Sequence, residues 1–282
     1  MSDEVAIKME HIQKIFLEVG NYMRNKYVLE DLIAFLDAHP PEFRSVAYES
    51  ASMELATYDL SRGTQFQEWE KLYSRRREVH SFHLDIGLGW AFAKAQRLPV
   101  LSWASPHPYM RLMVFDGMGY YYGLFRGRRT VRNHLFPPGI EGQDVQGFDQ
   151  GLGRRLWYIA QGEVKKVTQL IQGFPTSRRP DLWRGVGIAC GYVGGSKIAD
   201  LELLLVASGE NKDKLCTGVA LAAMSRNVSG SVTDDIKMAC RIICDMPFEK
   251  IVAFKPELTD ELKTRSDQDY SHWVTQLESW FE

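Results

Sequence analysis

The chain has 282 residues, of which 45% are hydrophobic and 25% are charged, the balance of an ordinary globular protein. Its formal net charge of −2 argues against a nucleic-acid partner, because the molecule as a whole does not attract polyanions. The acidic start lacks the order of a signal peptide, and the longest strongly apolar stretch, Leu203 to Ala207, is too short to cross a bilayer, so we expect a cytoplasmic protein without a membrane segment.

Residues 4–38 are predicted to form one or two amphipathic helices. The His39-Pro40-Pro41 sequence ends this region, because proline cannot continue a helix and biases the preceding residue away from helical backbone angles. Apolar residues recur near one face of the predicted helices: Ile7, Ile12, Ile15, Phe16, Val19 and Tyr22.

Pairs of small residues then recur at a nearly constant interval. The first members are Ala51, Gly87, Gly117, Gly151, Gly185 and Gly218, so successive pairs are 30 to 36 residues apart. A period in this range is typical of arrays of helix pairs. Glycine inside a helix costs about 1 kcal/mol relative to alanine, so a repeated glycine pair predicts the close approach of two helix backbones.

A second apolar segment follows each of the last three pairs. The segments 164–171, 198–205 and 236–243 carry apolar residues three and four apart, the spacing of a helix. The spacing of Trp183 and Gly187 also resembles part of the tetratricopeptide motif, which we interpret as shared geometry. The sequence therefore predicts an all-α protein in which tetratricopeptide-like helix pairs of about 34 residues stack into a short superhelix with a concave groove.

We expect a single helical-repeat domain that spans residues 1–282. Its predicted parts are N-terminal helices at 1–40, first repeats at 41–130, a central loop at 131–147, later repeats at 148–255 and a C-terminal capping helix at 256–282. The capping helix carries the apolar residues Tyr270, Trp273, Leu277, Trp280 and Phe281.

Acidic residues precede four of the small pairs. Glu49, Asp85 and Asp149 stand two positions before a pair, and Asp116 stands one before. On stacked helices these carboxylates would line one groove, where they would suit a cationic ligand or proton donation to an apolar polyene. The alternative is that they are helix N-caps or first-turn acids beside the positive end of a helix. Asp149 and Asp181 fit the cap interpretation best. The aromatic candidates for the groove walls are Trp90, Tyr120, Tyr121, Trp157 and Trp183.

His80 and His83 are three residues apart and share one face of a predicted helix. Their spacing allows a proton relay or half of a metal site, but further metal ligands are absent, and a His83 that hydrogen-bonds within the groove is the simpler interpretation. Histidine, with an ordinary pKa of about 6.5, is the first choice for acid–base work. If the protein is an enzyme, we expect His83 and Asp85 to form the acid–base pair, with Asp116 as a second carboxylate.

No motif predicts a cofactor or a metal. The Gly117-x-Gly119 and Gly185-x-Gly187 pairs lack the preceding strand and the third glycine of a nucleotide-binding loop. We interpret the cysteines as reduced core thiols, because they form no C-x-x-C pair and no histidine lies near them: Cys190, Cys216, Cys240 and Cys244.

Ordered blocks between about residues 36 and 245 carry a family resemblance. The main blocks are His39 to Glu49, His83 to Ala91, Asp116 to Gly119 and Phe174 to Cys190, with Arg155-Leu156-Trp157 between the last two. Together they resemble a bacterial domain-of-unknown-function family that is encoded in enediyne antibiotic gene clusters. The resemblance implies a cytoplasmic bacterial protein linked to polyketide-type natural products. It brings no catalytic residue, because the family has no settled reaction.

Two functions fit these observations. The first is a secondary-metabolism protein that binds an apolar, polyene-like intermediate in the groove, with acid–base rearrangement or cyclisation, or shielding of the intermediate for a partner enzyme. The second is a non-catalytic adaptor that binds a peptide or a biosynthetic partner protein, as helical repeats often do. An enclosed pocket with few charges favours the first function, and an open, charged groove favours the second.

Overall fold

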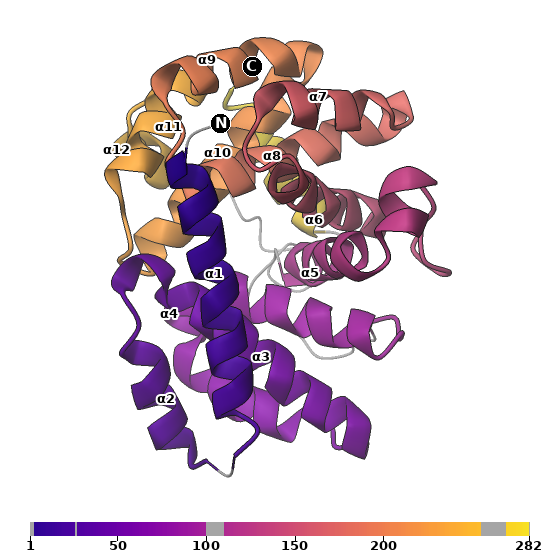
Figure 1. Ribbon diagram of the computed structural model, residues 1–282, viewed down its shortest axis with the longest axis vertical. Helices are drawn as coiled ribbons and strands as arrows, with labels where there is room; N and C mark the ends of the chain where they lie inside the picture. Colours follow the sequence, from indigo (N-terminus) through magenta and orange to yellow (C-terminus); the bar gives the residue numbers. More distant parts are fainter. Residues whose placement is uncertain (1–2, 26, 100–109, 255–268, 282) are drawn as a thin grey trace.

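The computed structural model describes residues 3–25, 27–99, 110–254 and 269–281, and every regular element in these ranges is a helix (Figure 1). The prediction of an all-α protein is therefore confirmed, whereas the tetratricopeptide-like geometry stays a prediction. The α-helices are α1 (Asp3–Tyr22), α2 (Leu29–Asp37), α3 (Pro41–Arg62), α4 (Gln67–Lys94), α5 (Met110–Phe125), α6 (Asp144–Ile159), α7 (Val164–Gln172), α8 (Arg179–Val193), α9 (Ile198–Ser208), α10 (Lys212–Val228), α11 (Asp234–Cys244), α12 (Phe248–Val252) and α13 (Asp269–Glu278). Shorter turns are the π-helical η1 (Arg128–Arg132) and the 3-10 helices η2 (Thr176–Arg178) and η3 (Gly209–Asn211).

Helix α1 lies along the outside of α3 and packs one apolar face against the molecule (Figure 1). Its residues Val5, Met9, Ile12 and Val19 are buried at the three- and four-residue spacing of one helix face. Ile7 was wrongly assigned to this face, because its side chain is 64% exposed. After α2, the chain passes through His39 and Pro40 to Pro41, which is the first residue of α3. Proline suits this position because its nitrogen has no hydrogen to leave unpaired.

Six helices, α3, α4, α5, α6, α8 and α10, pack side by side in chain order and form the inner layer of the molecule. Glycine pairs make the contacts. A Cβ added at Gly117 would overlap the carbonyl oxygen of Ile86 on the preceding helix, and one added at Gly119 would overlap that of Phe148 on the following helix. The same rule holds for the pairs that begin at Gly151 and Gly185. The predicted close approach is thus confirmed, and each pair joins one helix to both of its neighbours.

Helices α7, α9 and α11 form an outer layer over the later repeats, where α7 packs on α9 and α9 packs on α11. They match the second apolar segments expected from the sequence. The predicted loop at 131–147 is shorter in the structure, because η1 extends to Arg132 and α6 already begins at Asp144.

Helix α4 bends sharply at His80, whose φ of −126° and ψ of 17° interrupt the helical backbone. The two halves lie alongside each other, as the ring centroids of Phe66 and Phe92 are only 5.5 Å apart. The indole N–H of Trp69 donates to Ser52 Oγ (2.8 Å), and that hydroxyl donates to the Leu84 carbonyl (2.6 Å). The element is therefore a helix pair in its own right.

The inner layer curls until its last helix meets its first ones. Arg226 of α10 is buried, and its guanidinium donates to the carbonyl oxygens of Ser231 (2.8 Å), Tyr192 and Glu42 (3.4 Å). These bonds tie the end of α10 to α8 and α3. Where the sequence predicted a concave groove, the inner helices surround a central space.

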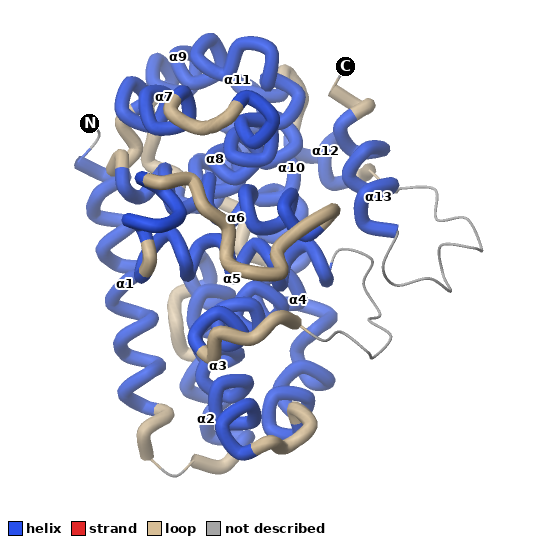
Figure 2. Tube along the Cα trace, turned by 90° about the vertical axis from the view of Figure 1, so that its right-hand side faces the viewer, coloured by secondary structure: helices blue, strands red, loops and turns tan. Residues whose placement is uncertain are grey.

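The described part of the C-terminal region is α13, which packs on α10 through buried Trp273, Val274 and Leu277. Figure 2 shows α13 and α1 on opposite sides of the stacked helices. The rest of the predicted capping segment, residues 256–268, and the side chain of Tyr270 lie outside the described residues. Among the helices that the structure describes, none has the length and apolar character required to cross a membrane.

All four cysteines are buried and unpaired, in agreement with their interpretation as core thiols. Burial raises the pKa of Cys190 and of Cys240 to about 12, so both stay protonated and unreactive at neutral pH.

Candidate functional site

The six inner helices and α1 surround a largely enclosed cavity of about 60 Å³. Because one water needs roughly 10–15 Å³ of such space, the cavity has room for a few water molecules. Most of its wall is apolar, with contributions from Ile12, Val46, Ile86 and Leu221. The polar residues at the wall are Glu49, His83, Asp116, Tyr120, Arg154, Tyr158, Tyr192 and Ser225.

Helix α1 covers the cavity, and its Ile12 and Phe16 form part of the wall. Lys8, one helical turn before Ile12, fastens α1 to the body of the molecule. Its ammonium group lies 2.5 Å from Asp235 of α11 and 3.4 Å from Glu42 of α3. The cover is thus held by ion pairs at one end and by apolar side chains over the cavity.

Glu49 is the most perturbed carboxyl group at the cavity wall. Burial raises its pKa to about 7; Arg154 opposes this effect and Asp116 adds to it. The indole N–H of Trp90 also faces Glu49 and lowers the pKa slightly, without completing a hydrogen bond of normal geometry. A carboxyl group with such a pKa exchanges a proton readily near neutral pH, which is the property of a general acid or base.

The buried Asp116 forms an ion pair with the partly buried Arg154 beside Glu49. Arg154 Nη1 donates to Asp116 Oδ1, and the amide of Gln150 donates to Oδ2 at 2.7 Å. The guanidinium of Arg154 also lies over the ring of Tyr120, 5.2 Å from its centroid. The pair provides one fixed positive and one fixed negative charge at the wall.

His83 contacts the cavity as a neutral imidazole, because burial and the nearby Arg154 lower its pKa well below 6.5. Its Nδ1 is 3.5 Å from Ser225 Oγ, and its ring lies 4.8 Å from that of Tyr192. His80 has separate partners: its Nδ1 is 2.9 Å from Ser45 Oγ, and its ring stacks on Tyr48. The structure therefore provides no direct relay between the two histidines.

Asp85 is not at the cavity, so the expected pair of His83 and Asp85 does not form. Residues two apart on a helix point to different sides, and the Asp85 carboxyl group turns toward Tyr73 in the first half of α4. Complete burial raises the pKa of Asp85 well above 3.8, because the core disfavours the ionised carboxylate.

The other predicted wall residues divide into two groups. Tyr120 lines the cavity, and Trp90 packs behind it, with 5.2 Å between the ring centroids. Tyr121 contacts Trp90 from outside the wall, at a centroid distance of 5.8 Å. Trp157 and Trp183 are buried between helices, away from the cavity.

Asp149 also lies away from the cavity, in a two-pronged ion pair with Arg178 whose Nε–Oδ2 distance is 2.8 Å. The N-cap alternative is wrong for Asp149, as it is for Glu49 and Asp116, because these residues stand inside α6, α3 and α5. The alternative of a first-turn acid holds for Asp181, which lies in the first turn of α8.

Four polar residues at the cavity wall are not among those predicted from the sequence: Arg154, Tyr158, Tyr192 and Ser225. A signal for them exists in the repeat. Tyr120, Arg154 and Ile188 each follow the second glycine of a pair directly, and all three line the cavity. The missed residues Tyr158 and Tyr192 come four positions after Arg154 and Ile188, on the same helix face.

Within the described ranges, no group of three or more His, Cys, Asp or Glu side chains is placed to hold a metal ion. No curated protein and no solved structure matches the chain. One family model, described as "Protein of unknown function (DUF1702)", matches residues 1–281. The match covers nearly the whole chain, whereas the resemblance noted in the sequence covered about residues 36–245. The chain belongs to this family of unknown function, DUF1702.

Proposed function

We propose that the protein binds the apolar, unsaturated part of a small-molecule intermediate in its central cavity, and that Glu49 exchanges a proton with it. The observation that carries this proposal is a carboxyl group with a pKa of about 7 on the wall of an enclosed, mostly apolar space. Ligand sites are commonly apolar pockets with a few convergent polar groups. The resemblance to a family from enediyne gene clusters supports polyketide-type secondary metabolism as the context, and a cytoplasmic location stays a prediction.

The proposed chemistry is a proton shift. Protonated Glu49 donates its proton to one carbon of a conjugated system, and a carbon next to the resulting cation then loses a proton to the Glu49 carboxylate or to the neutral imidazole of His83. In the second case the imidazolium returns the proton to the Glu49 carboxylate, which restores the starting state. The double bonds move and the molecular formula is unchanged, so no oxidant or other reactant is required. Two titratable groups whose environments move their pKa values apart are the usual basis for assigning acid and base. Asp116 is assigned to holding Arg154 in place.

A polyene is larger than the present cavity. Binding therefore requires Ile12 and Phe16 of α1 to move aside, and the cavity to enlarge on the side that α1 covers. The adaptor hypothesis is less well supported, because an open, charged groove would favour it, whereas the inner helices here surround a largely enclosed and mostly apolar cavity.

Native mass spectrometry of the protein purified from its own host tests the proposal. We expect a small, apolar molecule that is released on unfolding. Because a proton shift leaves its mass unchanged, NMR of the released molecule is compared, and we expect its double-bond positions to differ between the parent and Glu49→Gln. Glu54→Gln is the matched control, since Glu54 is on the same helix but pairs with Lys94 outside the cavity. A chain that carries no small molecule and retains a second protein would contradict ligand binding and support the adaptor.

A further inference from the structure

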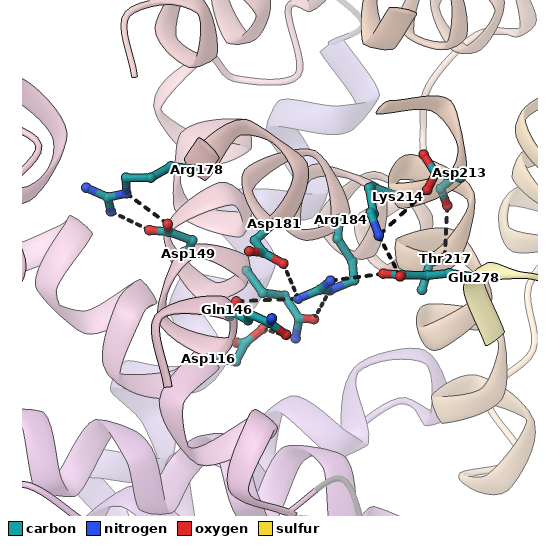
Figure 3. Close-up of polar contacts among 11 residues, drawn as sticks. Asp116, Gln146, Asp149, Arg178, Asp181, Arg184, Asp213, Lys214, Thr217 and Glu278 are labelled. Carbon is teal, nitrogen blue, oxygen red and sulfur yellow. Dashed lines mark hydrogen bonds and ion pairs between the residues drawn. The ribbon is translucent and has the colours of Figure 1, made fainter. Parts of the chain in front are cut away.

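A row of buried polar contacts leads from the cavity wall to the C-terminal helix (Figure 3). The Gln150 amide donates to Asp116 Oδ2 (2.7 Å), and its Oε1 accepts from Arg184 Nε (2.7 Å). Asp116 and Gln150 are completely buried and Arg184 is 1% exposed. The row thus crosses from α5 to α6 to α8 without contact with solvent.

Arg184 continues the row to α13. Its Nη1 lies 3.3 Å from Glu278 Oε1, and the other oxygen of Glu278 accepts from Lys214 at 2.5 Å. Asp181, 2.6 Å away, is a second carboxylate for the same guanidinium. Charges of opposite sign therefore alternate from Asp116, through Arg184 and Glu278, to Lys214.

The repeat brings these side chains together. Asp116, Gln150 and Arg184 each come directly before the first glycine of a pair, so they occupy equivalent positions on successive helices. Because those glycines bring the helix backbones into contact, the equivalent side chains meet without a gap.

The orientation of Gln150 follows from the chemistry of its neighbours. An ionised carboxylate only accepts hydrogen bonds and a guanidinium only donates them. The amide NH₂ must therefore face Asp116 while its oxygen faces Arg184, and neither end has another choice. A side chain constrained at both ends fixes the plane of the Asp116 carboxylate that receives Arg154.

We infer that Gln150 and Arg184 are positioning residues for the cavity, that they orient Asp116 and through it hold Arg154 beside Glu49, and that Glu278 anchors this row on α13. This inference rests on the proposed role of Glu49. Without the row, the Asp116 carboxylate is free to turn and Arg154 to move toward Glu49. The titratable and charged groups that face Glu49 from the surrounding helices are His83, Asp116, Tyr120, Arg154, Tyr158 and Tyr192.

The test is to titrate Glu49 and to monitor the titration by ¹³C NMR of the full chain, with labelled glutamate and no added ligand. The Glu49 signal is the one that disappears in Glu49→Gln. Asp116→Asn, which removes the negative neighbour directly, is the reference for a lowered pKa. We expect Gln150→Leu to lower the pKa of Glu49 by about 1, a tenfold fall in proton affinity, because an opposite charge that approaches a carboxylate favours its ionised form.

Two further variants complete the experiment. Arg184→Lys keeps the charge beside Asp181 and Glu278 but lacks the planar fork that reaches Gln150, so we expect a change in the same direction. Gln146→Leu is the matched control, since only the backbone carbonyl of Gln146 contacts Arg184. The inference is overturned if Gln150→Leu and Arg184→Lys fold and titrate like the parent while Asp116→Asn does not. The result is independent of whether a ligand is ever found.

Discussion

Glu49 and Asp85 show how the surroundings of a buried carboxyl group determine whether it is a candidate for proton exchange. Both are buried acids two positions before a small pair, and burial raises the pKa of both. Only Glu49 has a charged partner within reach and a face on the cavity. The structure therefore places Glu49 at the cavity wall and Asp85 in the core between helices, and only Glu49 is a candidate for proton exchange with a bound molecule.

The raised pKa of Glu49 predicts a specific dependence of stability on pH. A group with a higher pKa in the folded state contributes stability below its unfolded pKa of about 4.5, and that contribution disappears as pH rises through the folded value of about 7. The loss for this one group is roughly 3 kcal/mol, since one pKa unit corresponds to about 1.4 kcal/mol. Asp85 acts in the same direction.

We therefore expect Glu49→Gln to reduce the fall in unfolding free energy between pH 5 and pH 8, measured by urea denaturation at both values. Glu54→Gln, on the exposed side of α3, should leave the fall unchanged. Equal pH dependence in the parent and in Glu49→Gln would show that Glu49 is ionised in the folded protein at both pH values.

At the level of helices, the glycine pairs define which substitutions the inner layer tolerates. A Cβ at Gly151 would overlap the carbonyl oxygen of Asp116 and lie 2.6 Å from its carbonyl carbon. Because both are backbone atoms, neighbouring helices have to separate. We expect Gly151→Ala to destabilise the protein by about 2 kcal/mol or more despite alanine's higher helix propensity. Thermal unfolding measures the effect.

Gly127→Ala is the control for Gly151→Ala. Gly127 has a φ of −54°, and the nearest atom to an added Cβ is 4.0 Å away, on Val131. This variant should be neutral or slightly stabilising. A Gly151→Ala protein as stable as the parent would contradict the close packing of α5 and α6.

The same glycines explain how far the sequence could predict the fold. Their period identified the inner helices, and the apolar spacing after them identified α7, α9 and α11, because both signals are local. The bend of α4 at His80 gave no local signal in the sequence, and it places Tyr73 of the first half of α4 beside Asp85 of the second. Likewise, Arg154 can be identified as a cavity residue only when the structure shows that the residue after the second glycine of a pair faces the cavity.

For the molecule as a whole, the proposed function requires a route by which a ligand enters the largely enclosed cavity. Helix α1 is the cover, and the backbone at Gly162 lies next to its first turn: a Cβ at Gly162 would be 3.4 Å from the Cβ of Val5. That distance is close to the 3.5–4.5 Å typical of disulfides. A double variant, Val5→Cys with Gly162→Cys, should link α1 to the end of α6 under oxidising conditions.

We expect the oxidised double variant to exchange its bound small molecule much more slowly than the reduced one. Native mass spectrometry measures the exchange rate after an excess of the small molecules released from unfolded protein is added as competitor. The φ of +74° at Gly162 makes the cysteine there strained, so the single variant Gly162→Cys is the control for lost stability. Exchange at the same rate in both redox states would show that the ligand enters by another route.

The positions that follow the second member of each pair have a wider consequence. Backbone contacts at the small residues, rather than the side chains at these positions, set the distance between the inner helices, and at four of the positions the side chain lines the cavity. Changing one of them alters a single patch of the wall and leaves its neighbours in place. Comparing chains of this family at these four positions would therefore show how the wall of the cavity varies: Tyr120, Arg154, Ile188 and Leu221.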